Sequence, residues 1–260
     1  MGGVGGSRRH VAVTRPYDGL AAAWSTAASL VYEPLAASLV DASPIDLAGK
    51  LFLDLGSGTG TVAQALEANG ARVVVADCSL GMVLHGHQRG WTAIVADALA
   101  LPVRDGCFDA VIAGFLLNHV APSAALTEMA RAVRSGGVVV ASTWASARSD
   151  PVKVAIGDVL ASWGWRPPAW YETMKAEVEP ISGDPRRLSD AAEQAGWPTS
   201  TPWWSPKIWD SMIPALLLPT GWRCPKSPPG WLGSASLPPQ NWYGSCVSLS
   251  PRICRGGGPR

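Results

Sequence analysis

The segment that decides the fold is Leu51-Phe52-Leu53-Asp54-Leu55-Gly56-Ser57-Gly58-Thr59-Gly60-Thr61-Val62-Ala63-Gln64-Ala65-Leu66. Residues 51–55, four of them apolar, predict a buried strand. Three alternating glycines follow, and the apolar spacing after them predicts a helix. Glycine permits positive φ angles and a close backbone approach, and a helix N-terminus offers unpaired N–H donors. The segment therefore predicts a nucleotide-cradling turn between a parallel strand and a helix.

Asp54 distinguishes this turn from a plain dinucleotide loop. It lies inside the predicted strand, two residues before Gly56, where a carboxylate suits a cationic ligand better than a pyrophosphate. The pattern Asp-x-Gly-x-Gly-x-Gly resembles motif I of the class I S-adenosylmethionine-dependent methyltransferases. Two alternatives stay open at this point: a tight turn without ligand, and the dehydrogenase fingerprint that the frame Gly58-x-Gly60-x-x-Ala63 also matches.

The second predicted strand, residues 72–76, ends at Asp77. A carboxylate has two acceptor oxygens, so one at this strand tip can accept both hydroxyls of a ribose. The alternative is a cap for the helix predicted over residues 79–88, a role that Ser79 also suits. The run from Asp77 through Cys78 to Met82 resembles the family's second motif, in which the apolar residue at the Met82 position packs near adenine.

A third predicted strand, residues 92–96, ends at Asp97. The block from Asp97-Ala98 through Leu101-Pro102 to Phe108-Asp109 resembles the family's third motif. In that family the acid at the Asp97 position accepts a hydrogen bond from the adenine amino group. Carboxylates at two successive strand tips and in the glycine strand favour a ligand with a ribose, an aminopurine and a cationic tail.

The fourth predicted strand, residues 110–113, continues into Gly114-Phe115-Leu116-Leu117-Asn118-His119-Val120. Open α/β sheets bind ligands at these carboxyl ends. His119 is the one histidine placed there, and it can act as the base that takes a proton from the acceptor. A capping or core histidine is the alternative.

The flanking segments complete the predicted domain. Residues 17–40 predict a helix that resembles the family's N-terminal cap, with a break or new start at Pro34. Residues 122–134 predict a helix with Gly136 and Gly137 as its C-cap, and residues 138–143 predict strand five. The aromatic-rich stretch 144–180 resembles the insertion that forms the acceptor pocket in related enzymes, with a plain helical cover as the alternative, and residues 184–196 predict a helix.

Composition limits the remaining possibilities. The chain has 260 residues, 47% of them hydrophobic, and a net charge of +1, which predicts no strongly charged partner such as nucleic acid. Its five cysteines include no Cys-x-x-Cys pair, which favours reduced thiols in a cytoplasmic protein over disulfides or a metal site. No apolar run approaches the length of a membrane span, so no membrane association is predicted.

The carboxyl-terminal part has a different character. Residues 211–260 contain no Asp or Glu, nine prolines and seven glycines, with no sustained period of 2 or 3.6. In a GC-rich gene, a shifted reading frame favours Pro, Gly, Arg, Ser, Trp and Cys codons over acidic ones. We hypothesise a frameshift near residues 197–210, which predicts that residues 199–204 supply one late strand and that no second one follows.

The resemblance covers residues 17–197 and implies a doubly wound, mainly parallel α/β sheet with an incomplete carboxyl-terminal strand pair. Residues 1–16 are expected to be a flexible start, and 198–260 an irregular tail. The implied activity is methyl transfer from S-adenosylmethionine to an oxygen, nitrogen or carbon of a small molecule, with His119 as catalytic candidate and no metal. The alternatives are a non-catalytic or impaired relative and an NAD(P)-dependent oxidoreductase. The expected cofactor-binding residues are Asp54, Gly56, Ser57, Gly58, Gly60, Asp77, Cys78, Met82, Asp97, Ala98 and Phe115.

Overall fold

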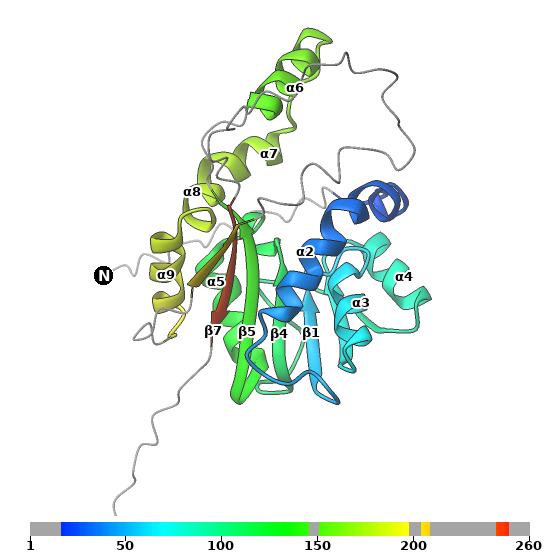
Figure 1. Cartoon of the computed structure of the whole chain (residues 1–260), viewed down its shortest axis with the longest axis vertical. Coiled ribbons are helices and arrows are strands. Elements are labelled where there is room, and N and C mark those ends of the chain that lie inside the picture. Colours follow the sequence, from blue (N-terminus) through cyan, green and yellow to red (C-terminus); the bar gives the residue numbers. More distant parts are fainter. Residues whose placement is uncertain (1–16, 146–150, 198–203, 209–242, 250–260) are drawn as a thin grey trace, which may run out of the picture.

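A central sheet organises the computed structural model, which describes residues 17–145, 151–197, 204–208 and 243–249 (Figure 1). The strand order is β3-β2-β1-β4-β5-β7-β6, and the first five of these strands run parallel. Their bounds are β1 Leu51–Leu55, β2 Arg72–Asp77, β3 Thr92–Val95, β4 Phe108–Gly114 and β5 Val133–Trp144. The order reverses between β1 and β4, so their carboxyl ends frame the position where such sheets bind ligands. The predicted doubly wound, mainly parallel fold is confirmed.

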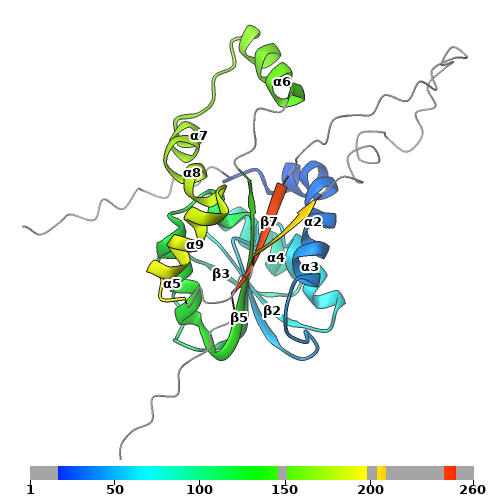
Figure 2. The ribbon, with the colours of Figure 1, turned by 60° about the vertical axis from the view of Figure 1, so that its left-hand side comes forward.

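Helices cover both faces of the sheet, and the alternation of strand side chains explains why (Figure 2). Phe52 packs with α2 and α3 on one face, whereas Leu53 packs with α5 and α9 on the other. Buried strands of a parallel sheet need apolar residues on both faces, which is why β1 is a nearly continuous apolar run. The helices are α2 Ser29–Asp41, α3 Thr61–Ala68, α4 Leu80–Gln88, α5 Pro122–Ala132 and α9 Pro185–Gln194.

The prediction of an incomplete carboxyl-terminal strand pair is wrong. β6 (Trp204–Ile208) and β7 (Tyr243–Leu249) complete a seven-stranded sheet, with β7 antiparallel to both β5 and β6. Tyr243–Leu249 shows little strand character in its sequence, but β5 presents an unpaired row of backbone groups that any such segment can satisfy. Residues 1–16 and most of 198–260 lie outside the described residues, so the flexible start and the frameshift stay predictions.

Two local boundaries also differ from expectation. The amino-terminal helix is continuous through α1 (Ala21–Ala23), the π-helical η1 (Trp24–Ala28) and α2, with Pro34 inside α2 rather than at a break. The glycines after α5 are not its C-cap, because α5 ends at Ala132 and β5 begins at Val133. A Cβ at Gly137 would meet the carbonyl oxygen of Asp109, so glycine here allows β5 to approach β4.

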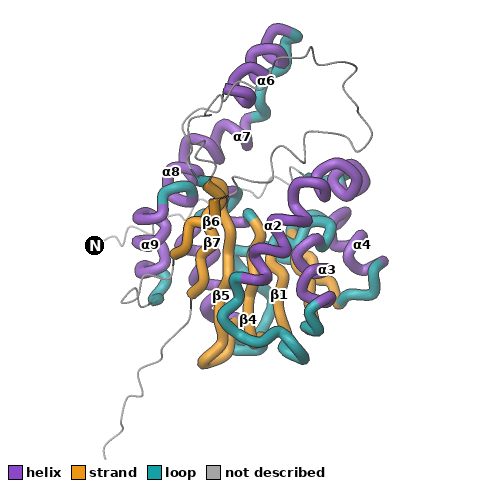
Figure 3. The backbone as a smooth tube through the Cα atoms, viewed as in Figure 1, coloured by secondary structure: helices purple, strands orange, loops and turns teal. Residues whose placement is uncertain are grey.

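The segment after β5 forms a helical extension at the carboxyl ends of the strands (Figure 3). It comprises α6 (Pro151–Ser162), α7 (Ala169–Thr173), the π-helical η3 (Met174–Val178) and α8 (Glu179–Ser182). In Figure 1, α6 stands away from the sheet while α8 leads back to α9. Within the described part of the chain, every helix is too short or too polar to cross a membrane.

Candidate active site

The glycine loop after β1 is tightly packed. Gly56, Gly58 and Gly60 have φ angles of 71°, 53° and 86°, a conformation that side-chain-bearing residues rarely adopt. A Cβ at Gly60 would overlap the ring of Trp91, and one at Gly56 would lie 2.9 Å from Leu116 Cδ1. The Gly56 N–H donates to the carbonyl oxygen of Ala76 at the end of β2, so the loop is tied to the neighbouring strand. All three glycines are therefore required by geometry.

Asp54 lies beneath this loop and is fully buried. One carboxylate oxygen, Oδ2, accepts the N–H of Ala63 at 2.9 Å, in the first turn of α3. That N–H has no partner within the helix, and an acid beside a helix N-terminus is favourable. The other oxygen, Oδ1, is buried and unpaired among the described residues. Burial raises the pKa of Asp54 to about 7, and the negative charge of Asp77 adds to the shift.

Asp77 joins the loop after β1 to the loop after β2. Its Oδ2 accepts the Gly58 N–H at 2.9 Å, and its Oδ1 accepts the Ser79 N–H at 2.9 Å. Burial raises the pKa of Asp77, and these two hydrogen bonds oppose the shift. Asp77 therefore holds the residue that precedes α4 but does not cap the helix, and the N-cap residue Ser79 has a buried hydroxyl that makes no hydrogen bond within the described chain, so the capping alternative is not met by either side chain. Each Asp77 oxygen retains a second lone pair for a ligand.

The other expected cofactor residues follow β2 and β3. Cys78 is half-buried beside Asp77, and Met82 is buried in α4. Asp97 follows β3, where its Oδ1 accepts the Leu99 N–H at 2.9 Å, and Ala98 is buried next to it. Ser57, also expected in the site, is a buried loop residue whose hydroxyl has no hydrogen-bond partner in the described part.

A cation on α5 anchors the turn that follows Asp97. The Arg131 guanidinium donates to the carbonyl oxygens of Leu101 and Val103 at 2.9 and 2.7 Å, and it pairs with Glu128 and Asp105. The Leu101 N–H donates back to Glu128. This network fixes the third-motif block against α5, so the position of Asp97 depends on more than its own strand.

Phe115 is the one residue other than glycine with positive φ among the described residues, at 61°. Only a few per cent of such residues adopt this conformation, and they gather at functional sites. The Phe115 ring stacks on Trp144, with centroids 4.6 Å apart, and meets the edge of Tyr32 at 5.3 Å. The chain thus turns sharply at the end of β4 and places an aromatic ring at the carboxyl ends of the strands.

His119 follows the short 3₁₀ turn η2 (Leu116–Asn118) after Phe115. Its Nε2 lies 3.4 Å from the Tyr17 hydroxyl, and the two rings meet edge to face. His119 is exposed at the surface, but neighbouring groups shield part of the imidazole, and this partial desolvation lowers its pKa below the ordinary value of 6.5. At neutral pH the ring is therefore mainly uncharged and able to accept a proton.

Six aromatic side chains extend this contact into a continuous cluster, which we call the aromatic cover. They come from the amino-terminal helix, the ends of β4 and β5, and α7. Trp24 reaches the cofactor side, since its Nε1 would lie 3.9 Å from a Cβ at Gly58. The structure thus places the glycine loop and His119 beside one continuous set of rings, to which Phe115 belongs. The members of the cover are Tyr17, Trp24, Tyr32, Phe115, Trp144 and Trp170.

Sequence reasoning missed two residues of this region, Tyr32 and Asn118. The buried Asn118 amide donates to the Ser182 hydroxyl of α8 at 3.1 Å, and its Oδ1 accepts the Trp144 N–H at 3.0 Å. It therefore ties the helical extension to the end of β5. Its place beside His119 was a sequence signal, but its partners lie 26 and 64 residues away.

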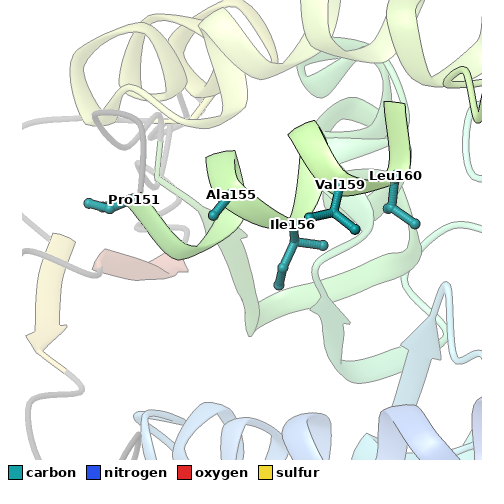
Figure 4. Close-up of a pocket in the computed structure, with 5 residues that line it drawn as sticks. All are labelled: Pro151, Ala155, Ile156, Val159 and Leu160. Carbon is teal, nitrogen blue, oxygen red and sulfur yellow. The ribbon is translucent and has the colours of Figure 1, made fainter. Parts of the chain in front are cut away.

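A separate hollow of about 490 Å³ lies along α6 (Figure 4). Its lining comes from α6 alone and consists of Pro151, Ala155, Ile156, Val159 and Leu160. No polar side chain points into it from these residues, and none of the expected site residues contributes to it. The hollow therefore lacks the convergent polar groups that lie at the carboxyl ends of the strands.

Comparisons with known proteins agree with this geometry. The family model described as methyltransferase domain, of the type 11 group, matches residues 53–141. Demethylmenaquinone methyltransferase of Beutenbergia cavernae is 36% identical over 159 residues, which cover 57% of this chain and 66% of that protein. The corresponding protein of Mycobacterium marinum is 35% identical and covered to 62%, so the chain spans slightly less than two thirds of these relatives.

Solved structures show the same fold. An S-adenosylmethionine-dependent methyltransferase from Mesorhizobium loti has a TM-score of 0.51 at 16% identity, over 82% of this chain and 96% of that one. The family match, the relatives and the strand-end geometry agree. Residues 53–141 match a methyltransferase domain of the type 11 group, and the fold is similar to that of a solved S-adenosylmethionine-dependent methyltransferase.

Proposed function

We propose that this protein transfers a methyl group from S-adenosylmethionine to a small-molecule acceptor bound under the aromatic cover. The observation that carries the proposal is the Asp77 carboxylate, which is hydrogen-bonded to Gly58 and Ser79 beside the β1–β4 switch point. This arrangement leaves a carboxylate, a glycine loop and a helix N-terminus around one position.

The residues at this position fit the proposed cofactor. Asp54 Oδ1 and the hydroxyls of Ser57 and Ser79 are buried and unpaired within the described chain, and such groups usually have partners. A Cβ at Gly58 would have Trp24 Nε1, at 3.9 Å, as its nearest neighbour, so a ligand can approach the loop backbone at this glycine. Asp77 would hold the ribose hydroxyls, Asp97 the adenine amino group, and Gly56 and Gly58 the amino-acid tail. When bound, the cofactor supplies an electrophilic methyl group on a sulfonium.

The acceptor side supplies positioning and a base. His119 is uncharged at neutral pH and lies at the end of η2, where it can take the proton of an acceptor hydroxyl or amine. In this proposal the aromatic cover aligns a flat acceptor by stacking, and alignment is the main source of rate in such a transfer. The relatives are named for a quinone substrate, which supports an aromatic acceptor of that class.

Two measurements test this function. Calorimetry with S-adenosylmethionine and with NADH separates the methyltransferase from the oxidoreductase alternative, and we expect binding of the first only. A screen of quinols and hydroxyaromatic compounds with methyl-labelled cofactor then seeks the acceptor. Cofactor binding without label transfer to any of them would favour the non-catalytic alternative, and NADH binding alone would overturn the proposal.

Variants of two histidines test the base. We expect His119→Ala to lower turnover by about 10²–10⁴ while cofactor affinity stays nearly unchanged. His87→Ala, at an exposed position of α4, is the matched control and should behave like the unmodified protein. Turnover of His119→Ala within a few-fold of the control would leave His119 as a wall residue.

A further inference from the structure

Tyr17 occupies a junction between the two sides of the site. Its hydroxyl lies 3.4 Å from His119 Nε2, and its ring contacts Trp24 at 5.2 Å and Trp170 at 6.1 Å between centroids. It also lies close enough to Asp77 for the negative charge of that carboxylate to act on its phenol. One side chain therefore touches the candidate base, the amino-terminal helix and α7, and borders the carboxylate expected to hold the ribose.

The backbone around Tyr17 explains how it reaches both sides. The turn at residues 17–19 precedes α1 and lies against the start of α4, since a Cβ at Gly81 would be 3.8 Å from the Gly19 nitrogen. Because α4 begins directly after Asp77 and Cys78, any ligand that reorders this strand tip also meets the Tyr17 turn. His119 approaches the same ring from the end of η2.

The protonation states of Tyr17 and His119 decide which nitrogen of the imidazole can act as the base. Burial, with the nearby negative groups, raises the pKa of Tyr17 to about 12, so the phenol stays protonated at neutral pH. A histidine acting as base needs one ring nitrogen without hydrogen, and which one is free is set by the hydrogen bond that the other makes. The 3.4 Å contact allows either group to donate. If the Tyr17 hydroxyl donated to Nε2, Nδ1 would carry the hydrogen and neither nitrogen would be free, so the role of His119 as base requires Nε2–H to donate to the Tyr17 oxygen and leaves Nδ1 free. After proton uptake both nitrogens carry hydrogen, and the same contact stabilises the imidazolium.

We propose that Tyr17 is a positioning residue that couples the cofactor side to His119, because its hydroxyl fixes the imidazole tautomer and its turn lies against the start of α4, which follows the Asp77–Cys78 strand tip. The proposal deepens the methyltransferase function and rests on it for the role of His119. The tautomer itself can be observed without any methyl transfer, so the two ideas fail separately.

Nitrogen-15 NMR of the full chain tests this coupling. The His119 resonances, assigned with His119→Ala, should show mainly the Nε2–H tautomer in the unmodified protein. In Tyr17→Phe we expect a mixture of tautomers and a His119 pKa lower by about 0.5–1 pH unit, because the imidazolium loses its acceptor. Tyr171→Phe removes a hydroxyl from a tyrosine that also packs on Trp170, and as the control it should change neither quantity.

Titration with S-adenosylhomocysteine tests the other half of the proposal. Binding should shift the His119 resonances in the unmodified protein and shift them much less in Tyr17→Phe, which keeps the ring and hence the fold. Tyr17→Phe should also lower kcat more than it raises the KM for cofactor, and should add nothing in a His119→Ala background. The proposal would be overturned if Tyr17→Phe left the His119 tautomer unchanged, or if Tyr171→Phe changed it as much as Tyr17→Phe does. If the tautomers behave as expected but no methyl label is transferred to any acceptor, only the proposed methyltransferase function is refuted.

Discussion

The glycine loop and the aromatic cover meet over the carboxyl ends of β1 and β4, but different forces hold them. The loop is built from backbone groups, with its three glycines at positive φ; the Asp77 carboxylate accepts the N–H of Gly58, and Asp54 accepts the N–H of Ala63 in the helix that follows the loop. The cover is built from side-chain rings of separate elements, and few hydrogen bonds link them.

This difference predicts how each side responds to change. Backbone geometry and buried carboxylates allow little variation, because each replacement leaves strain or an unpaired buried group. Aromatic contacts contribute about 0.5–1.5 kcal/mol each beyond burial and can be exchanged singly. We therefore expect cofactor binding to depend on the loop and acceptor choice to depend on the cover.

The largest effect is expected from Gly60→Ala. The new side chain would take a φ of 86° and overlap the Trp91 ring, so we expect a loss of about 2–5 kcal/mol in the free energy of unfolding. Gly90→Ala is the control, since Gly90 has a φ of 90° with open space around it, and it should lose only about 1–2 kcal/mol. Equal losses in urea unfolding would show that close packing of the loop is unimportant.

Asp77→Ala should weaken S-adenosylmethionine binding by about 1.5–3 kcal/mol, because it removes charged hydrogen bonds to the ligand and to the loop. Asp77→Asn keeps one acceptor oxygen, so its affinity for S-adenosylmethionine should fall between those of the unmodified protein and Asp77→Ala. Asp41→Ala, an exposed acid at the end of α2, is the calorimetric control. Unchanged affinity in Asp77→Ala would remove this residue from the cofactor side.

Trp144→Leu tests the opposite side. Loss of the stacked contact with Phe115 should raise the KM for acceptor by about 3–10-fold while the Kd for S-adenosylmethionine stays within twofold. Trp163→Leu replaces a tryptophan that is 80% exposed and should alter neither constant. If Trp144→Leu weakened the cofactor instead, the division between the two sides would be wrong.

The last prediction concerns pH. The Asp54 pKa is about 7 in the folded protein and about 3.9 when unfolded, so the folded state binds more protons between these values. Stability should therefore fall as pH rises from about 4 to about 7, by at most about 1.4 kcal/mol per pH unit, and level off above. Asp54→Asn should flatten this slope in urea titrations, although Asp77, whose pKa is also raised, keeps part of it. An equally steep slope in the variant would assign the effect elsewhere.

Sequence patterns predicted the parallel half of the molecule well. Strand β1 has the predicted bounds, and β2 to β4 differ from prediction by three residues or fewer at either end. Continuous apolar runs and glycine turns are local signals. The apolar run that ends at Leu55 and the glycine that follows it are therefore enough to predict β1. The start of β5 was less predictable, because the close approach of β5 to β4 makes Gly137 a strand residue. The start of α2 was also less predictable, because the helix continues through Pro34 and does not break there.

By itself, the sequence determined the fold family, the strand-end position of the expected cofactor residues and the place of His119, because spacing along one chain fixes which residues come directly after each strand. Only the tertiary structure decided that β7 completes the sheet, that Asn118 ties α8 to β5, and that Tyr17 meets His119 across 102 residues. These contacts join distant segments. The free energy that selects them comes from unsatisfied strand edges and ring packing, neither of which leaves a local pattern.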